Sequence, residues 1–436
     1  MPAALFAALC AALGAIAHWR YAIFRYDVDL GIFTQIIAST GRGFSSTAEG
    51  SVDHLLVHWS PIVVAAWPAL RLFGPAGLEY FQVVAVCATL FPVWGLARRR
   101  FGPNGATAVL AVAAIYPILW ANAVADFHEM AFVPVLCATL VYAADRRQWP
   151  LAAATAALLL CTKEDQFVVL AINGALFAVT AGDNTGQRRA GWIAAGCAVA
   201  AALAYFGIVR PALNPQVPYL SLHFFDWRGS TEPVTEVLLT RSRYAVVILA
   251  PLAFLPLISR YGLFLIPGLL EIFASREPVA LAPGAHYSAL LTGYALVAFV
   301  DGAARLQRYR PNLARVAVAV AGAVALAIGI FASPMEYWYY LYRRPNAHDA
   351  RLEAALRRLP PDAAVGAEDE IFAHLGLDRN ASVNFHGQPW FVYDITHYSQ
   401  RWHDVDEAAV RDAVAGKTYA VIAGDDGIVV LRRVRR

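Results

Sequence analysis

Long apolar segments recur along most of this sequence, with short polar stretches between them. A segment of roughly 20 apolar residues is long enough to cross a bilayer as a helix. The pattern therefore predicts an all-α polytopic membrane domain over residues 1–332, with about eleven transmembrane helices. The expected spans are residues 3–24, 76–97, 104–122, 130–145, 150–162, 166–181, 190–209, 243–259, 261–275, 285–301 and 313–332.

The connection between the first two spans, residues 25–75, carries helical patterns of its own. Apolar residues from Leu30 to Ile37 recur on one helical face, which predicts a helix lying along the membrane interface. Ser60 and Pro61 open a second apolar helix, and at about 14 residues it is too short to span the bilayer. Two interfacial helices in this first outer loop would cover the outer mouth of the bundle.

The composition changes after residue 332, where the long apolar segments stop. Alternating and amphipathic patterns replace them, which is typical of a small soluble unit. The expected elements are a helix over 349–359, a strand over 363–367, a helix over 369–375 and a hairpin over 419–431. We expect residues 333–436 to form a small extracytoplasmic α/β cap domain.

Arginine clusters in short loops set the expected orientation. They are Arg98-Arg99-Arg100, Arg146-Arg147, Arg188-Arg189, Arg260 and the set from Arg305 to Arg315. Short loops rich in Lys and Arg are retained on the cytoplasmic side of a membrane. We therefore expect a multi-pass protein of the inner (plasma) membrane, with a cytoplasmic N-terminus and an extracytoplasmic C-terminal domain.

Composition supports the membrane assignment. The chain is 59% hydrophobic and only 15% charged, whereas soluble domains carry about 25% charged residues. The net charge of +3 arises from basic residues beside the spans, so we expect membrane lipid, and no nucleic acid, among the partners.

Asp27 and Asp29 come directly after the first span. A carboxylate at the mouth of a membrane helix is energetically costly unless it is solvated, paired or functional. The two can be helix-end charges in the headgroup region, or one of them can be a general base or a substrate clamp. The residues alone leave both possibilities open.

Asp126, His128 and Glu129 place three titratable groups within four residues between two spans. A solvated turn explains any one of them, whereas three together favour a functional site. Asp and His can bind a divalent metal, but this spacing is not specific for one. A divalent metal is therefore possible, and no cofactor is certain.

Basic and aromatic groups are expected on the same outer side. Lys163 adjoins the fifth span without a spacer, so it either extends its ammonium group to water or binds a phosphate as a point charge. Arg276 and His286 fit the same phosphate role. The expected phosphate- and substrate-binding residues are Lys163, His286, Arg276, His58, His128, Glu129, Glu164, Asp165 and Tyr287.

Five short motifs follow one another in a specific order and spacing. They are Asp29-Leu30-Gly31-Ile32-Phe33, His58-Trp59-Ser60-Pro61, Asp126-Phe127-His128, Lys163-Glu164-Asp165 and His286-Tyr287-Ser288. Together they resemble a bacterial family of polytopic membrane proteins of unknown function, which is itself similar to the GT-C glycosyltransferases. The resemblance covers most of residues 20–300, and Val365–Asp369 with His374 and Leu375 resembles the start of that family's outer C-terminal part.

The resemblance implies a GT-C-like fold and an inverting transfer of sugar from a polyprenyl-phosphate donor to a glycan, lipid or protein acceptor of the cell envelope. By this resemblance Asp29 would be the catalytic base, and Asp126 a second acid that supports the site or orients the substrate. Asp27 departs from the family pattern, so the choice between Asp27 and Asp29 stays open. Lys163 and His286 would hold the carrier phosphate.

Two other functions are alternatives. A transporter or flippase favours inverted repeats and charges at the bilayer midplane, whereas here the charges collect at one surface and no repeat is visible. A non-catalytic membrane scaffold that binds the lipid carrier would keep the fold and the cap without depending on Asp29.

Overall fold

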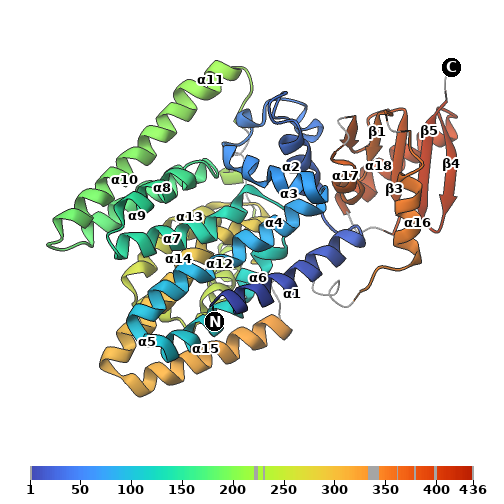
Figure 1. Ribbon diagram of the computed structural model, residues 1–436. Coiled ribbons are helices and arrows are strands. Elements are labelled where there is room, and N and C mark those ends of the chain that lie inside the picture. Colours follow the sequence, from blue (N-terminus) through green and yellow to red (C-terminus); the bar gives the residue numbers. More distant parts are fainter. Residues whose placement is uncertain are drawn as a thin grey trace.

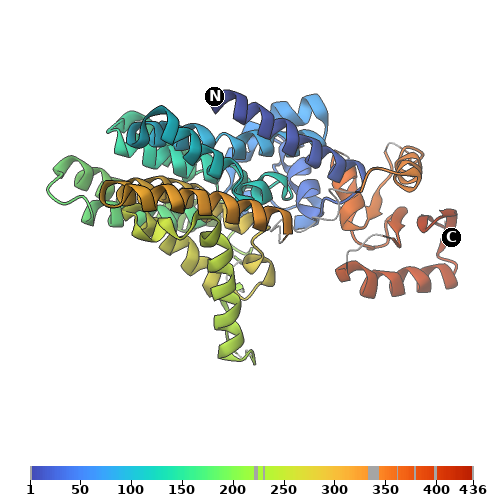
Figure 2. The same cartoon turned by 90° about the horizontal axis from the view of Figure 1, so that it is seen from below.

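The computed structural model describes residues 2–219, 224–228, 231–331, 343–360, 362–377, 380–396 and 400–434. A body of packed helices makes up most of the molecule, and a small unit of helices and strands lies at one end of it (Figures 1 and 2). The C-terminal end of the first helix (dark blue in Figure 1) points toward this unit.

The body is built from consecutive helices of very different lengths. In chain order they are α1 (Pro2–Ala22), α2 (Val28–Ala38), α3 (Trp67–Phe73), α4 (Ala76–Cys87), α5 (Leu90–Ala114), α6 (Pro117–Val124), α7 (Val133–Asp145), α8 (Trp149–Leu159), α9 (Asp165–Val179), α10 (Thr185–Ala204), α11 (Arg210–Leu213), α12 (Val234–Leu249), α13 (Ile266–Ala274), α14 (Ala289–Tyr309) and α15 (Pro311–Phe331). Helix α14 is the central one, because every residue from Ala289 to Ala304 is buried.

Five helical stretches in the described part of the chain are long and apolar enough to cross a membrane. They are Pro2–Ala22, Ala76–Ala114, Thr185–Leu213, His286–Tyr309 and Pro311–Phe331. This agrees with a helical, polytopic membrane protein. The count of eleven spans stays a prediction, since several other apolar helices are shorter, such as α8 and α9.

The expected span 104–122 is wrong as a single helix. Helix α5 ends at Ala114 and a new helix begins at Pro117. Proline fits the first turn of a helix but lacks the N–H that a helix interior requires. Helix α5 is itself interrupted at Gly102, whose positive φ of 68° is accessible to glycine without strain.

The expected spans 243–259 and 261–275 are also wrong at their boundaries. Helix α12 already begins at Val234, directly after Pro233. Residues 250–265 then form a series of short 3₁₀ turns that contain Pro251 and Pro256, and α-helix resumes only at Ile266. The prolines explain the loss of α-helical hydrogen bonding, which apolar composition alone does not reveal.

The connection between the first two expected spans, residues 25–75, contains the two expected short helices. Helix α2 matches its prediction and buries Leu30, Phe33, Ile36 and Ile37. The second begins as a 3₁₀ helix, Pro61–Ala66, and continues as α3. Their position at a membrane interface stays a prediction.

The terminal unit is a five-stranded sheet with helices. Its strands are β1 (Val365–Ala367), β2 (Ala381–Val383), β3 (Trp390–Asp394), β4 (Tyr419–Asp425) and β5 (Ile428–Arg433), and its helices are α16 (Ala347–Leu356), α17 (Asp369–Leu375) and α18 (Gln400–Ala415). The order is β2-β1-β3-β5-β4, with β1 parallel to both of its neighbours and the other two pairs antiparallel. The helix over 369–375 and the hairpin match the sequence prediction, whereas β2, β3 and α18 were not predicted.

The terminal unit, which we call the cap, packs directly on the segment between α1 and α4. A Cβ atom on Gly31 of α2 would lie 2.4 Å from the ring of Phe372 on α17, so only glycine fits this contact without movement. The amide of Gln35 donates a hydrogen bond to the carbonyl of Ala381 at 3.0 Å. Helix α2 therefore connects the helical body to the cap. The division of the chain at residue 332 stays a prediction, and residues 332–342 lie outside the described residues.

Candidate functional site

Asp29 lies in the first turn of α2, directly after the start of the helix. Asp27 is the N-cap residue, and its side chain accepts a hydrogen bond from the backbone N–H of Val28 at 2.8 Å. Asp27 thus satisfies one of the backbone N–H groups that a helix start leaves without a partner. The side chain of Asp27 is therefore engaged in capping helix α2. Asp29 is the carboxylate of the pair that lies beside His128 and His286.

The carboxyl of Asp29 is poised to exchange a proton near neutral pH. Burial, followed by the negative charges of Asp27 and Glu129, raises the pKa of Asp29 to about 7. Lys163 and His58 act in the opposite direction but do not cancel these effects. A carboxyl group with this pKa is well matched to general-base catalysis at physiological pH.

Two histidines lie beside Asp29. The rings of His128 and His286 stack with their centroids 3.7 Å apart and their planes 6° apart. The donor atoms of Asp29, His128 and His286 all lie within 4.8 Å of one another. The Nε2 atom of His286 is buried and has no hydrogen-bond partner among the described residues. One carboxylate and two imidazoles can hold a divalent cation, and the imidazoles can also donate to a phosphate oxygen.

Helix α4 holds the segment that carries His128. The backbone N–H of Phe127 donates to Glu79 Oε1 at 2.9 Å, and that of His128 donates to Gln82 Oε1 at 3.2 Å. Both acceptors are buried, and they are three residues apart on one face of an apolar helix. Glu79 and Gln82 were not among the predicted site residues, although two polar residues at helical spacing within an apolar segment indicate a functional position.

Lys163 is buried among acidic and aromatic groups. Its ammonium nitrogen lies 3.4 Å from Glu129, 4.0 Å from Asp165 and 5.5 Å from the ring centre of Tyr287. Burial alone would lower the pKa of Lys163, but the charges of Asp165 and Glu129 outweigh burial and raise it. The lysine is therefore a fixed cation in this site. Glu271 of α13 hydrogen-bonds Asp165 and extends the acidic set.

Glu164 joins the segment 25–75 to the connection between α8 and α9. It accepts hydrogen bonds from the backbone N–H of Trp59 and from the hydroxyl of Tyr219, each at 2.8 Å, and lies 2.7 Å from His58 Nδ1. Burial would raise the pKa of Glu164, but His58 and Lys163 lower it to about 2. Glu164 thus orients His58, which is close enough to influence Asp29.

Asp126 lies near Asp29 and connects three segments of the chain. Its carboxylate accepts a hydrogen bond from the backbone N–H of Asp27 at 2.6 Å and pairs with Arg20 at 3.2 Å. Arg20 also donates to the carbonyl of Val124. Asp126 therefore fixes the start of α2 against the ends of α1 and α6. Arg20 was not among the expected site residues, although a charge inside the first apolar segment pointed to it.

The cap also reaches the site. Asp369, at the start of α17, hydrogen-bonds Asp27, and burial together with the charge of Asp27 raises the pKa of Asp369 to about 8. A protonated Asp369 can donate this hydrogen bond to Asp27. Asp369 was also missed as a site residue, because nothing in the local sequence indicates that α17 packs on α2.

Arg276 is the expected phosphate-binding residue that the structure places elsewhere. Its guanidinium donates to the carbonyl of Asp226 and lies over the ring of Trp227, 5.7 Å from its centre. No hydrogen bond or ion pair joins it to the other expected residues in the described part of the chain. Those residues, by contrast, converge around Asp29 and Lys163.

Comparison with known proteins places this arrangement in a family. Residues 20–430 match the model of the family described as "Predicted membrane protein (DUF2079)". The chain belongs to this family. A search of curated proteins finds no significant match.

Three solved structures resemble this DUF2079 chain. ArnT from Cupriavidus metallidurans in the apo state aligns with a TM-score of 0.61 at 11% identity, covering 100% of this chain and 99% of ArnT. ArnT bound to undecaprenyl phosphate aligns with a TM-score of 0.59 at 12% identity over 98% of each chain. The Archaeoglobus fulgidus oligosaccharyltransferase aligns with a TM-score of 0.42 at 12% identity, covering 99% of this chain and 74% of its own. The two ArnT structures are of GT-C glycosyltransferases, so the expected resemblance of the family to GT-C proteins is confirmed at the level of the fold.

Proposed function

We propose that the protein is an inverting glycosyltransferase that moves a sugar from a polyprenyl-phosphate carrier to an envelope acceptor at the outer face of the bacterial inner membrane. The observation that supports this most strongly is the position of Asp29. Its carboxyl, with a pKa of about 7, lies beside His128 and His286 and within the influence of the buried cation Lys163. A base and phosphate-binding groups are the two components that this transfer needs.

The residues divide the reaction between them. The acceptor hydroxyl oxygen attacks the anomeric carbon on the face opposite the carrier phosphate, and Asp29 accepts the hydroxyl proton as the new C–O bond forms. The bond between the anomeric carbon and the phosphate oxygen breaks, and its electron pair leaves with the carrier phosphate. Attack from the opposite face inverts the configuration.

The leaving phosphate needs cationic or N–H donors where its charge develops. His286 offers a buried Nε2 atom without a hydrogen-bond partner among the described residues. Lys163 lies 3.4 Å from Glu129 and 4.0 Å from Asp165, which is longer than the roughly 2.7–2.9 Å of a strong charge-assisted hydrogen bond. An incoming phosphate can therefore compete with these carboxylates for the ammonium group.

A divalent cation also fits the donor set of Asp29, His128 and His286. When bound, such a cation supplies Lewis-acid stabilisation of phosphate charge. In that case Asp29, in its ionised form, His128 and His286 would hold the cation, and Lys163 would remain to pair with the phosphate.

The choice of carrier rests on the fold. The ArnT structure that resembles this chain over 98% of its length holds undecaprenyl phosphate. A polyprenyl-phosphate sugar is therefore the donor class that we propose. The sugar and the acceptor are left to experiment.

The test is turnover of the purified full-length protein in nanodiscs with a panel of radiolabelled polyprenyl-phosphate sugars. We compare the wild type with Asp29→Asn, and we use Asp226→Asn as the matched control because Asp226 is a remote carboxylate paired with Arg228. The proposal expects transfer or hydrolysis in the wild type and in the control. A general base contributes about 100-fold or more, so Asp29→Asn should lose at least that factor while it still binds the carrier. Carrier binding without turnover in every variant would instead support the scaffold alternative.

A further inference from the structure

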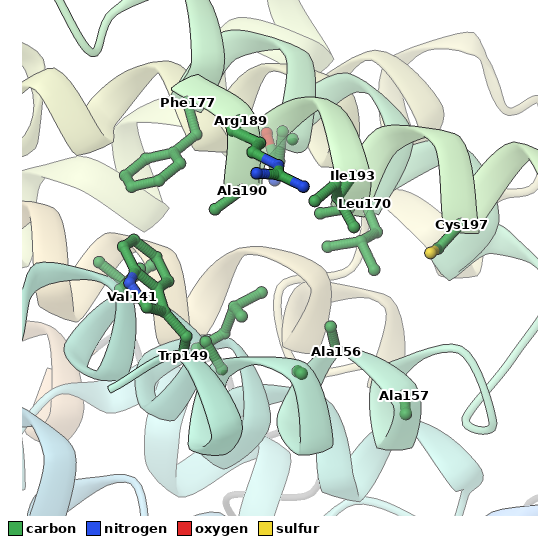
Figure 3. A pocket seen from close by; sticks show the side chains of 18 of the residues that line it. Val141, Trp149, Ala156, Ala157, Leu170, Phe177, Arg189, Ala190, Ile193 and Cys197 are labelled. Atoms are coloured by element: carbon green, nitrogen blue, oxygen red, sulfur yellow. The ribbon is translucent and has the colours of Figure 1, made fainter. Parts of the chain in front are cut away.

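A cavity of about 530 Å³ lies between α8 and α10. It extends from Trp149 and Arg189 at one end to Leu160 and Cys197 at the other. Figure 3 shows Trp149, Ala156 and Ala157 on one side of it and Arg189 and Ile193 on the other. A volume of this size lies within the roughly 300–1,000 Å³ of sites that bind small organic ligands.

The cavity results from an uneven packing of neighbouring helices. Helix α10 packs closely along α9, because Gly174 and Gly191 allow their backbones to approach: a Cβ on Gly191 would lie 2.5 Å from the carbonyl of Gly174. Helix α8 packs on α7 and hardly touches α10. The α8 side of the gap carries mainly alanines, such as Ala153 and Ala156, which are too small to fill it.

The lining is apolar except near one end. There the guanidinium of Arg189 projects at the cavity, and Arg189 is exposed and has no hydrogen bond or ion pair among the described residues. Arg188 adjoins it, and Arg146 and Arg147 lie in the loop just before α8, at the same end. Trp149, the first residue of α8, has the amphipathic ring that favours the headgroup level of a bilayer.

We propose that this cavity binds one acyl chain of an anionic phospholipid, whose phosphate pairs with Arg189. The apolar lining suits a hydrocarbon chain, and the arginines complement a negative headgroup. Basic pockets between membrane helices are known to select anionic lipids in this way. Arginine suits the role because its planar guanidinium binds phosphate oxygens in pairs. This site is separate from the Asp29 cluster, and the inference does not depend on the proposed transfer reaction.

The test uses the full-length protein in phosphatidylcholine nanodiscs. Two preparations are compared. One contains a minor fraction of phosphatidylglycerol with a photoactivatable acyl chain, and the other contains the same fraction of phosphatidylcholine with that chain. Crosslinked peptides are mapped by mass spectrometry. The wild type should label peptides of α8 and α10 more strongly with phosphatidylglycerol. One arginine near a membrane surface contributes roughly fivefold to the binding of an anionic lipid. Arg189→Gln should therefore lower this labelling about fivefold, and Arg315→Gln, an exposed arginine outside the cavity, should leave it unchanged.

A second variant tests the acyl chain separately. Ala156→Trp fills the cavity and should abolish crosslinking to its lining residues on α8 and α10 with either lipid, while labelling of peptides from α15 persists. Ala153→Leu serves the same purpose with a smaller change if the tryptophan variant does not fold. The proposal would be overturned if both lipids labelled α8 and α10 equally and Arg189→Gln did not change this labelling. So would preferential labelling by a photoactivatable polyprenyl phosphate, because the cavity would then hold the carrier tail.

Discussion

The carboxylate of Asp126 accepts a hydrogen bond from the backbone N–H of Asp27 at 2.6 Å. The same carboxylate pairs with Arg20 at 3.2 Å. This relationship joins the end of α1, the start of α2 and the connection after α6, three segments that are distant in sequence. Asp29 lies two residues after Asp27, in the first turn of α2. By holding the backbone of Asp27, Asp126 therefore positions Asp29, and no direct contact between the carboxylates of Asp126 and Asp29 is needed.

Removal of Asp126 should destabilise the protein. The side chain of Arg20 is 8% exposed, and Asp126→Ala would leave its guanidinium without this counter-charge. Breaking a buried ion pair by removing one partner costs about 3–5 kcal/mol. We expect a clearly lower unfolding midpoint in detergent and a partial recovery in the double variant Arg20→Met/Asp126→Ala. If the double variant is no more stable than the single one, the pair does not have this role.

The transfer rate should depend on pH through Asp29. The folded-state pKa of this carboxyl is about 7, and a base acts only when it is deprotonated. We therefore expect kcat/KM to rise about tenfold per pH unit below pH 7 and to level off above it. The measurement is a pH–rate profile between pH 5 and pH 9, where the range is chosen to lie about two units on either side of that pKa.

Asp27→Asn provides a matched test of that profile. Asparagine is as good an N-cap as aspartate, so helix α2 should remain intact. The substitution removes a negative charge that raises the pKa of Asp29, and the profile should move to lower pH. An unchanged midpoint would mean that another group controls the profile.

A divalent cation should stabilise the protein in a pH-dependent way. Binding by Asp29, His128 and His286 requires an ionised carboxylate and neutral imidazoles, so it should be stronger at pH 8 than at pH 6. We expect Mn²⁺ to raise the thermal midpoint of the wild type more at the higher pH. His286→Ala should lose this shift, and a shift that persists in the variant would place the cation elsewhere.

Much of the site could be predicted from the sequence because its residues lie in short polar segments between long apolar ones. Asp29, His128 and Lys163 come from segments that are more than thirty residues apart, and the packing of the helices brings them together. Arg276 shares that pattern but turns toward Trp227 instead. Topology places a residue on one side of the membrane, and only the packing of its own loop decides which way the side chain points.

The missed residues have a different cause. Glu79 and Gln82 lie inside an apolar helix, whereas the predicted site residues lie in polar segments between the apolar ones. Asp369 joins the site only because α17 packs on α2, a contact between residues more than three hundred positions apart. The predicted helix boundaries near residue 250 were wrong because Pro251 and Pro256 interrupt the α-helix, although the segment stays apolar beyond them.

Glu164 should act on His58 rather than on the substrate. Trp59 and Tyr219 donate to different oxygens of Glu164, so Glu164→Gln keeps an acceptor for one of them and removes the charge that pairs with His58. Burial lowers the pKa of His58, but the charges of Glu164 and Glu129 and the hydrogen bond to Glu164 together outweigh burial and raise it. We therefore expect the His58 pKa, followed by NMR of labelled imidazole, to fall in Glu164→Gln. A pKa equal to that of the wild type would contradict this assignment.

The contact between Gly31 and Phe372 should control how the cap docks. A Cβ on Gly31 would lie 2.4 Å from the Phe372 ring, and overpacking of this kind costs about 1–3 kcal/mol. We expect Gly31→Ala to lower stability and to increase hydrogen exchange in α17. Gly14→Ala is the control, because nothing lies within 4 Å of its Cβ position and alanine is favoured within a helix.

A double-mutant cycle makes this prediction specific. Phe372→Ala removes the ring that a Gly31→Ala methyl group would meet, so the two changes should not be additive. The double variant should be less destabilised than the sum of the single variants, and its α17 should exchange no faster than in Phe372→Ala alone. Simple additivity would mean that the cap is held mainly by other contacts, such as the hydrogen bond between Gln35 and Ala381.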